Sequence, residues 1–168
     1  MKKMFFFILF SFDVFSQTKS ENDYHYLNLG VHPQYIFDRN DRSLIIPVSY
    51  EYLPFFFNRT YGIGINANYN DIKINNQKEF SFGIRNSFYL TKKEIIRPYI
   101  GFGIQYGYLK ILNTWNHHGG RWQARIFGGI RIKIAKHYMV FSEIGNYRLG
   151  SNKFNLGVGI TRILNNPE

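Results

Sequence analysis

Cysteine is absent from this 168-residue chain, which excludes disulfide bonds, thiolate metal sites and cysteine nucleophiles. Acidic residues are scarce, with 11 Asp plus Glu against 21 Lys plus Arg, so the net charge is +10. No apolar run approaches the roughly 20 residues that a membrane-spanning helix requires. Aromatic residues make up 19% of the chain, which argues against a disordered basic tail. The length and composition predict one ordered, aromatic-rich domain, and we expect it to be built from strands.

The first 16 residues have the pattern of a secretory signal peptide. Two lysines precede an apolar run over residues 4–12, and Ser16 stands at the expected cleavage site. We expect the mature protein to begin at Gln17 and residues 17–168 to form a single β-barrel domain. Loss of two lysines and one aspartate with residues 1–16 changes the net charge from +10 to +9. The excess of basic residues therefore belongs to the mature chain.

Beyond this leader the chain divides into eight segments of alternating residue character, separated by turn-forming clusters. The expected strands are residues 24–37, 42–53, 61–70, 80–89, 98–108, 121–135, 138–147 and 152–164. Strands joined by short connections in sequence order indicate an antiparallel up-and-down meander, and closure into a barrel removes both exposed edges.

The two faces of these strands differ in size and polarity. In the fifth segment Phe102 and Ile104 share a bulky apolar face, whereas Gly101 and Gln105 share a small or polar one. The interior of an eight-stranded barrel is only just wide enough for side chains, so bulky faces would overfill it. We therefore expect the bulky faces to point outward into lipid, with aromatic girdles near both ends. The predicted fold is an all-β, eight-stranded antiparallel up-and-down transmembrane β-barrel; a secreted soluble lipid-binding barrel, with the apolar faces inward, is the alternative.

The last segment, FNLGVGITRIL over residues 154–164, has the alternation of a barrel-closing strand. Together with the leader and the eight girdled segments, it resembles the small outer-membrane β-barrel proteins of Gram-negative bacteria. These include the OmpA-like transmembrane, OmpX-like and PorT-like groups, and the phenylalanine-rich leader followed by Gln17 resembles those of Bacteroidota. The resemblance implies a bacterial outer-membrane location. It also implies contact with outer-membrane lipids, including lipopolysaccharide, and with other envelope proteins.

The small faces carry charges that would lie inside the barrel. The charged residues expected in this lumen are Glu51, Arg85, Arg125, Arg131, Lys133 and Glu143, and the neutral polar ones are His32, Gln34, Gln105 and Gln123. Buried charges need partners, so each glutamate should bridge one or more arginines. Two acids against four bases leave +2, which implies internal water or an anion. A selective conduit for anions is one interpretation; a polar plug that sets the barrel register is the other, favoured because eight strands leave no aqueous bore.

The longest outer connection carries Trp115, His117 and His118, which are candidates for contact with lipid phosphates or a metal. Adjacent histidines diverge and no third ligand is recognisable, so we expect neither a metal site nor a cofactor. A lipid A-modifying enzyme is an alternative function, motivated by the outer histidine pair, for which the nearby candidates are Ser142, Glu143, His117 and His118. Successive strand residues point to opposite faces, so we assign no catalytic residues.

The basic residues are spread over outer connections, inner turns and the expected lumen, with no continuous stripe. This distribution predicts anionic lipid headgroups as partners and no nucleic acid. The main functional hypothesis is a non-enzymatic barrel with a role in envelope integrity or as the membrane subunit of an envelope complex.

Three places depart from regular alternation. Pro33 and Pro47 lie inside the first two segments, and we expect them nearly opposite each other in one bulge. A second bulge is expected near Gly128, because Phe127 and Gly128 reverse the expected faces of the sixth segment. In the seventh segment Met139 and Phe141 occupy the face that Glu143 assigns to the lumen, which leaves that segment ambiguous.

Overall fold

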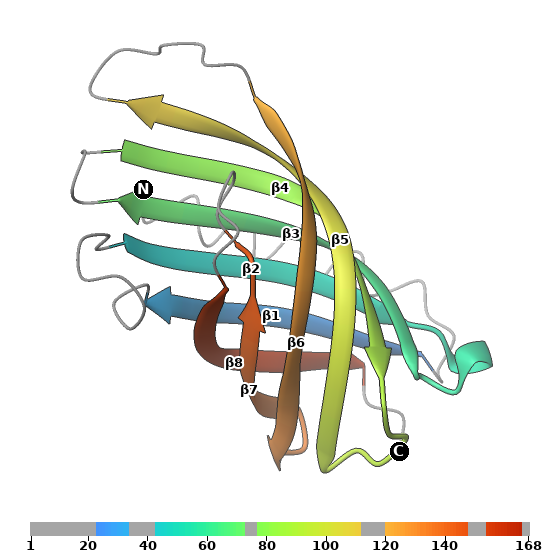
Figure 1. Cartoon of the computed structure of the whole chain (residues 1–168). Coiled ribbons are helices and arrows are strands. Elements are labelled where there is room, and N and C mark those ends of the chain that lie inside the picture. Colours follow the sequence, from blue (N-terminus) through green and yellow to red (C-terminus); the bar gives the residue numbers. More distant parts are fainter. Residues whose placement is uncertain (1–22, 34–42, 73–76, 112–119, 148–153, 166–168) are drawn as a thin grey trace.

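The computed structural model describes residues 23–33, 43–72, 77–111, 120–147 and 154–165. Eight strands form a closed barrel in which each strand pairs with its sequence neighbours and β1 pairs with β8 (Figure 1). All pairs are antiparallel. The strands are β1 Tyr24–Pro33, β2 Ser43–Leu53, β3 Tyr61–Ile72, β4 Gln77–Tyr89, β5 Ile96–Ile111, β6 Arg121–Ala135, β7 Tyr138–Gly145 and β8 Asn155–Asn165. The predicted fold class is therefore confirmed.

One end of the barrel carries the connections β2–β3, β4–β5 and β6–β7, together with the start of β1; we call it the turn end. The β2–β3 connection contains a three-residue 3-10 helix, η2 (Phe55–Phe57), seen at the right of Figure 1. After this helix Asn58 and Arg59 adopt positive φ angles of 50° and 57°, which reverse the chain toward β3. No helix in the described ranges is long and apolar enough to cross a membrane.

The bulky faces point outward on every strand. Phe102 is 52% exposed and Ile104 49% exposed, and Leu156 and Val158 are exposed in the same way on β8. Between the two outward residues of β5, Gly103 faces the interior, and Gln105 beyond them is fully buried. The structure thus has the orientation expected of a transmembrane barrel and differs from the inward apolar face expected of a soluble lipid-binding one.

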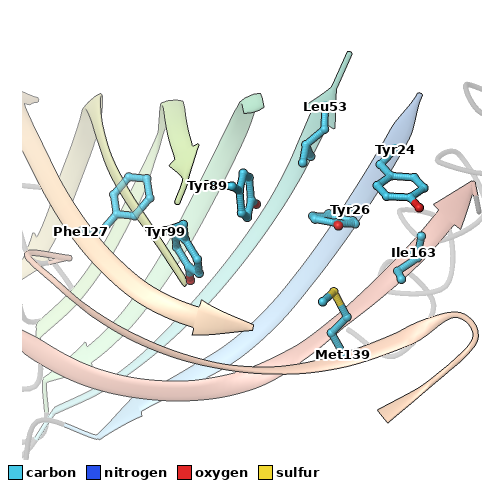
Figure 2. Close-up of a cluster of buried hydrophobic side chains, with 8 residues drawn as sticks. All are labelled: Tyr24, Tyr26, Leu53, Tyr89, Tyr99, Phe127, Met139 and Ile163. Atoms are coloured by element: carbon cyan, nitrogen blue, oxygen red, sulfur yellow. The ribbon is translucent and has the colours of Figure 1, made fainter. Parts of the chain in front are cut away.

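The interior near the turn end is filled by aromatic and aliphatic side chains (Figure 2). This cluster consists of Tyr24, Tyr26, Leu53, Tyr89, Tyr99, Phe127, Met139 and Ile163. Met139 and Phe141 are buried on the same face of β7 as Glu143, so this strand alternates regularly and its ambiguity is resolved.

The expected bulge at the two prolines is wrong. Pro33 pairs with Leu44, and the β1–β2 register stays constant on both sides of an interruption at Gly30 and Val31. Pro47 lies against Gly30, where an added Cβ would meet the proline ring at 3.3 Å. Because proline has no N–H to donate, the ladder opens beside Pro47 without a change of register.

The expected bulge at Gly128 is also wrong. Gly128 and Gly129 keep their register against both β5 and β7. Phe127 is an inward-facing aromatic residue on a regular strand, not a sign of reversed faces. The register shift in β6 comes instead between Lys133 and Ala135, close to the tight turn into β7.

Candidate functional site: a charged network inside the barrel

Glu51 is the first of two acidic centres that bind Arg131, Arg85 and Arg125 in the barrel interior. It is fully buried on β2, and its Oε2 accepts a hydrogen bond at 2.8 Å from the guanidinium of Arg131 on β6. Its Oε1 accepts a second hydrogen bond, at 3.0 Å, from the Tyr89 hydroxyl. Gly62 on the neighbouring strand leaves the space that this carboxylate occupies, since an added Cβ there would collide with it.

Glu143 is the second acidic centre. Its Oε2 accepts hydrogen bonds from Arg85 at 3.0 Å and from the Tyr99 hydroxyl at 2.5 Å, and its Oε1 accepts one from Arg125 at 3.2 Å. All of these side chains are at most 4% exposed. Charge-assisted hydrogen bonds of this kind offset the large cost of removing the ions from water.

Aromatic rings cover the guanidinium groups that the glutamates hold. The Arg131 guanidinium lies 4.7 Å from the Tyr99 ring centroid and 4.9 Å from that of Tyr26. The Arg85 guanidinium lies 4.2 Å from Phe127, and the Arg125 guanidinium lies 3.9 Å from Tyr147. Cation–π contacts strengthen when both groups are desolvated, so the rings stabilise charges that have lost their hydration.

Neutral polar residues continue the network and close the lumen. Ser49 Oγ accepts hydrogen bonds from Arg85 at 3.1 Å and from Asn28 at 3.0 Å, and Thr161 donates to Asn28 at 2.6 Å. The cavity that remains beside Ser49, Arg85 and Glu143 has a volume of about 10 Å³. Such a space holds about one water molecule, so this part of the interior is closely packed.

The structure brings together five of the six charged residues that the sequence places in the lumen, namely Glu51, Arg85, Arg125, Arg131 and Glu143. Lys133 is different: its Nζ lies 3.1 Å from a carboxylate oxygen of Glu94 at the turn end. Both side chains are partly exposed, because β6 approaches its final turn at this point and the long lysine chain reaches solvent.

Glu94 collects several donors at the turn end. Its carboxylate accepts hydrogen bonds from Lys133 and the Tyr24 hydroxyl, and Arg59 lies 3.7 Å away. Partial burial by itself raises the pKa of the Glu94 carboxyl. The hydrogen bonds from Tyr24 and Lys133 and the charges of Lys133 and Arg59 lower the pKa by more than burial raises it, so it lies below its ordinary value.

Arg97 is a buried cation that the sequence analysis missed, because it was placed in a turn before the fifth strand. In the structure β5 begins at Ile96, and Arg97 faces inward and is 1% exposed. Its guanidinium donates to the Tyr26 hydroxyl at 2.5 Å and to the Arg59 carbonyl, and it lies 4.2 Å from the Tyr89 ring centroid. The signal was present in the alternation, since Arg97, Tyr99 and Gly101 continue one face.

Three of the four neutral polar residues predicted in the lumen lie within the described residues. His32 and Gln105 are buried in the lumen and Gln123 is half-buried, joined to Gln105 by a hydrogen bond of 3.1 Å. The predicted outer-loop residues Trp115, His117 and His118, and also Gln34, lie outside the described residues.

Ser142 and Glu143, two of the candidates for catalysis, lie on opposite faces of β7. Glu143 points into the lumen, whereas Ser142 lies on the outer face of β7. Within the described ranges no three His, Asp or Glu side chains are grouped so that they could hold a metal ion.

No protein-family model matches the chain, and no curated protein matches it. Solved structures do resemble it. The N-terminal β-barrel domain of Pseudomonas aeruginosa OprF is 12% identical with a TM-score of 0.56, covering 86% of this chain and 99% of that one. Neisserial surface protein A is 10% identical with a TM-score of 0.57, covering 84% and 96%. The outer-membrane enzyme PagL is 12% identical with a TM-score of 0.53, covering 82% and 98%.

These neighbours include an enzyme and proteins not named as enzymes, and sequence identities this low are evidence for a shared fold alone. Three observations point to the same fold: the closed antiparallel strand order, the outward apolar faces, and a match that covers nearly the whole of each neighbour. The chain has the eight-stranded fold of the small bacterial outer-membrane β-barrels.

Proposed function

We propose that this protein is an integral barrel of the bacterial outer membrane that works as a closed structural element of the envelope and not as a pore or an enzyme. The observation that carries the proposal is the contrast between the two faces of the sheet. Exposed Ile, Leu, Val and Phe side chains cover the outside, while the inside holds paired glutamates and arginines beside the aromatic cluster of the turn end. An apolar exterior of this extent is unfavourable in water and matches the acyl region of a bilayer.

The closed interior supports a structural role over transport. Three ion pairs, at 2.8, 3.0 and 3.2 Å, link β2, β4, β6 and β7 across the lumen. Arg85–Glu143 and Arg131–Glu51 join residues 58 and 80 positions apart, whereas Arg125–Glu143 joins the neighbouring strands β6 and β7. The two long-range pairs form only when the strands are in the native register. A rigid barrel of this kind supports a role in envelope integrity or as the membrane subunit of an envelope complex.

The opposite faces of Ser142 and Glu143 support the non-enzymatic proposal. We further propose outer-membrane lipids, including lipopolysaccharide, and other envelope proteins as partners, with no role in nucleic-acid binding. The leader pattern of residues 1–16 and Gln17 supports secretion and a PorT-like, Bacteroidota-type lineage.

Site-directed spin labelling tests the location directly, because the chain has no native cysteine. Nitroxides at Ile104→Cys and Val158→Cys, in barrels reconstituted into vesicles, should be accessible to oxygen and shielded from a water-soluble nickel chelate. Lys93→Cys, on the exposed β4–β5 connection, is the control and should show the reverse. Aqueous accessibility at Ile104 and Val158 would contradict a membrane-embedded exterior.

Two further measurements test the closed, non-enzymatic role. Planar bilayers containing the protein should carry no steady ionic current, since the cavity beside Ser49, Arg85 and Glu143 has room for about one water molecule. Deletion of the gene should increase sensitivity to detergents while lipid A mass spectra stay unchanged. A stable ohmic conductance would contradict the plug, and an altered lipid A mass would favour the enzyme.

A further inference from the structure

The turn end of the barrel contains an open pocket that the interior network does not fill. Its volume is about 210 Å³, and its charged lining residues are Arg59, Lys92, Glu94 and Arg97. Tyr24 and Phe55 provide aromatic walls, and Asn58 adds a polar side chain. The pocket is therefore some twenty times larger than the cavity within the plug, which is about 10 Å³.

Positive charge in this pocket exceeds negative charge. Three cations line it, and its one carboxylate, Glu94, already binds Arg59, Lys133 and the Tyr24 hydroxyl. Among the described residues, four cations including Lys133 face Glu94 and the nearby Asp23, whose carboxylate accepts a hydrogen bond from the Phe55 N–H. The surroundings of the pocket therefore keep an excess of basic groups even with both acids ionised. A concave, basic site of this kind concentrates anions.

Arg97 is the residue that points to a ligand. It is 1% exposed, its Nε has no hydrogen-bond partner, and among the described residues no carboxylate pairs with it. Its two other nitrogens donate to Tyr26 and to the Arg59 carbonyl, which hold the guanidinium in place at the pocket wall. A buried guanidinium without an acid is costly, and an anion entering the pocket would offset that cost.

We propose that this pocket binds the phosphate group of an anionic ligand, with Arg97 and Lys92 as the principal contacts. Phosphate offers several acceptor oxygens, which suit a guanidinium N–H together with an ammonium group better than one carboxylate does. Phe55, on the pocket wall, is 53% exposed, so an apolar chain attached to the phosphate would find an apolar surface beside it. The phosphate belongs either to a soluble phosphate ester or to the headgroup of an anionic phospholipid, and the inference does not depend on the proposed envelope role.

The test is a titration of the full barrel in a neutral maltoside detergent, followed by arginine Nε–Hε resonances in ¹H–¹⁵N spectra. The probes are inorganic phosphate, glycerol 3-phosphate and short-chain phosphatidylglycerol, with acetate and short-chain phosphatidylcholine as controls at matched ionic strength. The resonance absent from the Arg97→Lys spectrum identifies Arg97. We expect it to shift saturably with a phosphate-bearing anion and not with acetate or phosphatidylcholine.

Two charge-reversal variants in one exposed connection separate pocket binding from general attraction. Lys92→Glu changes a lining residue and should weaken binding at least about tenfold, which corresponds to about 1.4 kcal/mol. Lys93→Glu changes an exposed neighbour that does not line the pocket and should weaken it less than about threefold, since salt screens more distant charges.

Each outcome decides the proposal. Saturable shifts with glycerol 3-phosphate or inorganic phosphate support it and identify soluble phosphate as the source. Shifts with phosphatidylglycerol alone support it and identify a lipid headgroup. The proposal is overturned if no phosphate-bearing probe shifts Arg97, if acetate shifts it equally, or if Lys93→Glu weakens binding as much as Lys92→Glu.

Discussion

Glu143 balances two arginines at once, so its neutralisation perturbs the interior network most. Its carboxylate lies 3.0 Å from Arg85 and 3.2 Å from Arg125, and its side chain is 2% exposed. Glu143→Gln preserves the size of the side chain but leaves two guanidinium groups without their acid in a space that holds about one water molecule. Removal of one partner from a buried ion pair costs about 3–5 kcal/mol, because the remaining charge is uncompensated. We expect the free energy of unfolding to fall by that amount.

Glu94→Gln is the matched control at the turn end. It removes the same kind of charge from a side chain that is 43% exposed and lies 3.1 Å from Lys133. Ion pairs that water reaches contribute about 0–1 kcal/mol, so this variant should lose far less stability. The difference between the two variants measures the effect of burial on the same chemical change.

The assay is reversible urea unfolding of the barrel in lipid vesicles, followed by tryptophan fluorescence. A second variant, Glu143→Gln with Arg125→Gln, removes one of the two uncompensated charges and should recover part of the loss. A loss below about 1 kcal/mol in Glu143→Gln, or one equal to that of Glu94→Gln, would refute the view that the interior charges are desolvated and mutually dependent.

Three further predictions concern packing, the lipid face and pH. Gly101→Val should lower the free energy of unfolding by about 1–3 kcal/mol in the same urea assay, since its Cβ would overlap the Phe127 ring. Gly128→Ala is the control: its Cβ makes only ordinary contacts, so the free energy of unfolding should change by less than about 0.5 kcal/mol. Ile104→Arg should cost about 2–4 kcal/mol in vesicles if the residue lies near the bilayer centre, and unfolding free energies in vesicles check this. The lowered pKa of Glu94 means that its ionised form stabilises the folded state above the unfolded pKa, and that this contribution is lost as the pH falls through the lower folded pKa. Glu94→Gln should therefore make stability less dependent on pH in acid, and an unchanged slope between the two proteins would contradict it.

The alternation of residues was sufficient to predict the eight strands and their inward and outward faces. It also placed Glu51, Glu143 and three arginines together before any pairing was known, because a period of two assigns each side chain to one side of a sheet. The errors came where local patterns were overinterpreted. Phe127 was predicted to mark a reversal of the strand faces because it is bulky, but the interior admits an aromatic ring where Gly101 and Gly145 leave space beside it.

The sequence by itself determined the architecture: its alternation allows only a sheet, its bulky faces exceed the volume of an eight-stranded interior, and its polar faces are small enough to be enclosed. Only the tertiary structure decided which charges meet. Glu51 and Arg131 are 80 positions apart and approach to 2.8 Å only because closure of the barrel places β2 and β6 on facing sides of the lumen. Closure of the barrel also places Lys133 beside Glu94 at the turn end and buries Arg97, which has no acid partner among the described residues. The depth of a side chain along the barrel depends on strand tilt and turn position, which residue alternation does not encode.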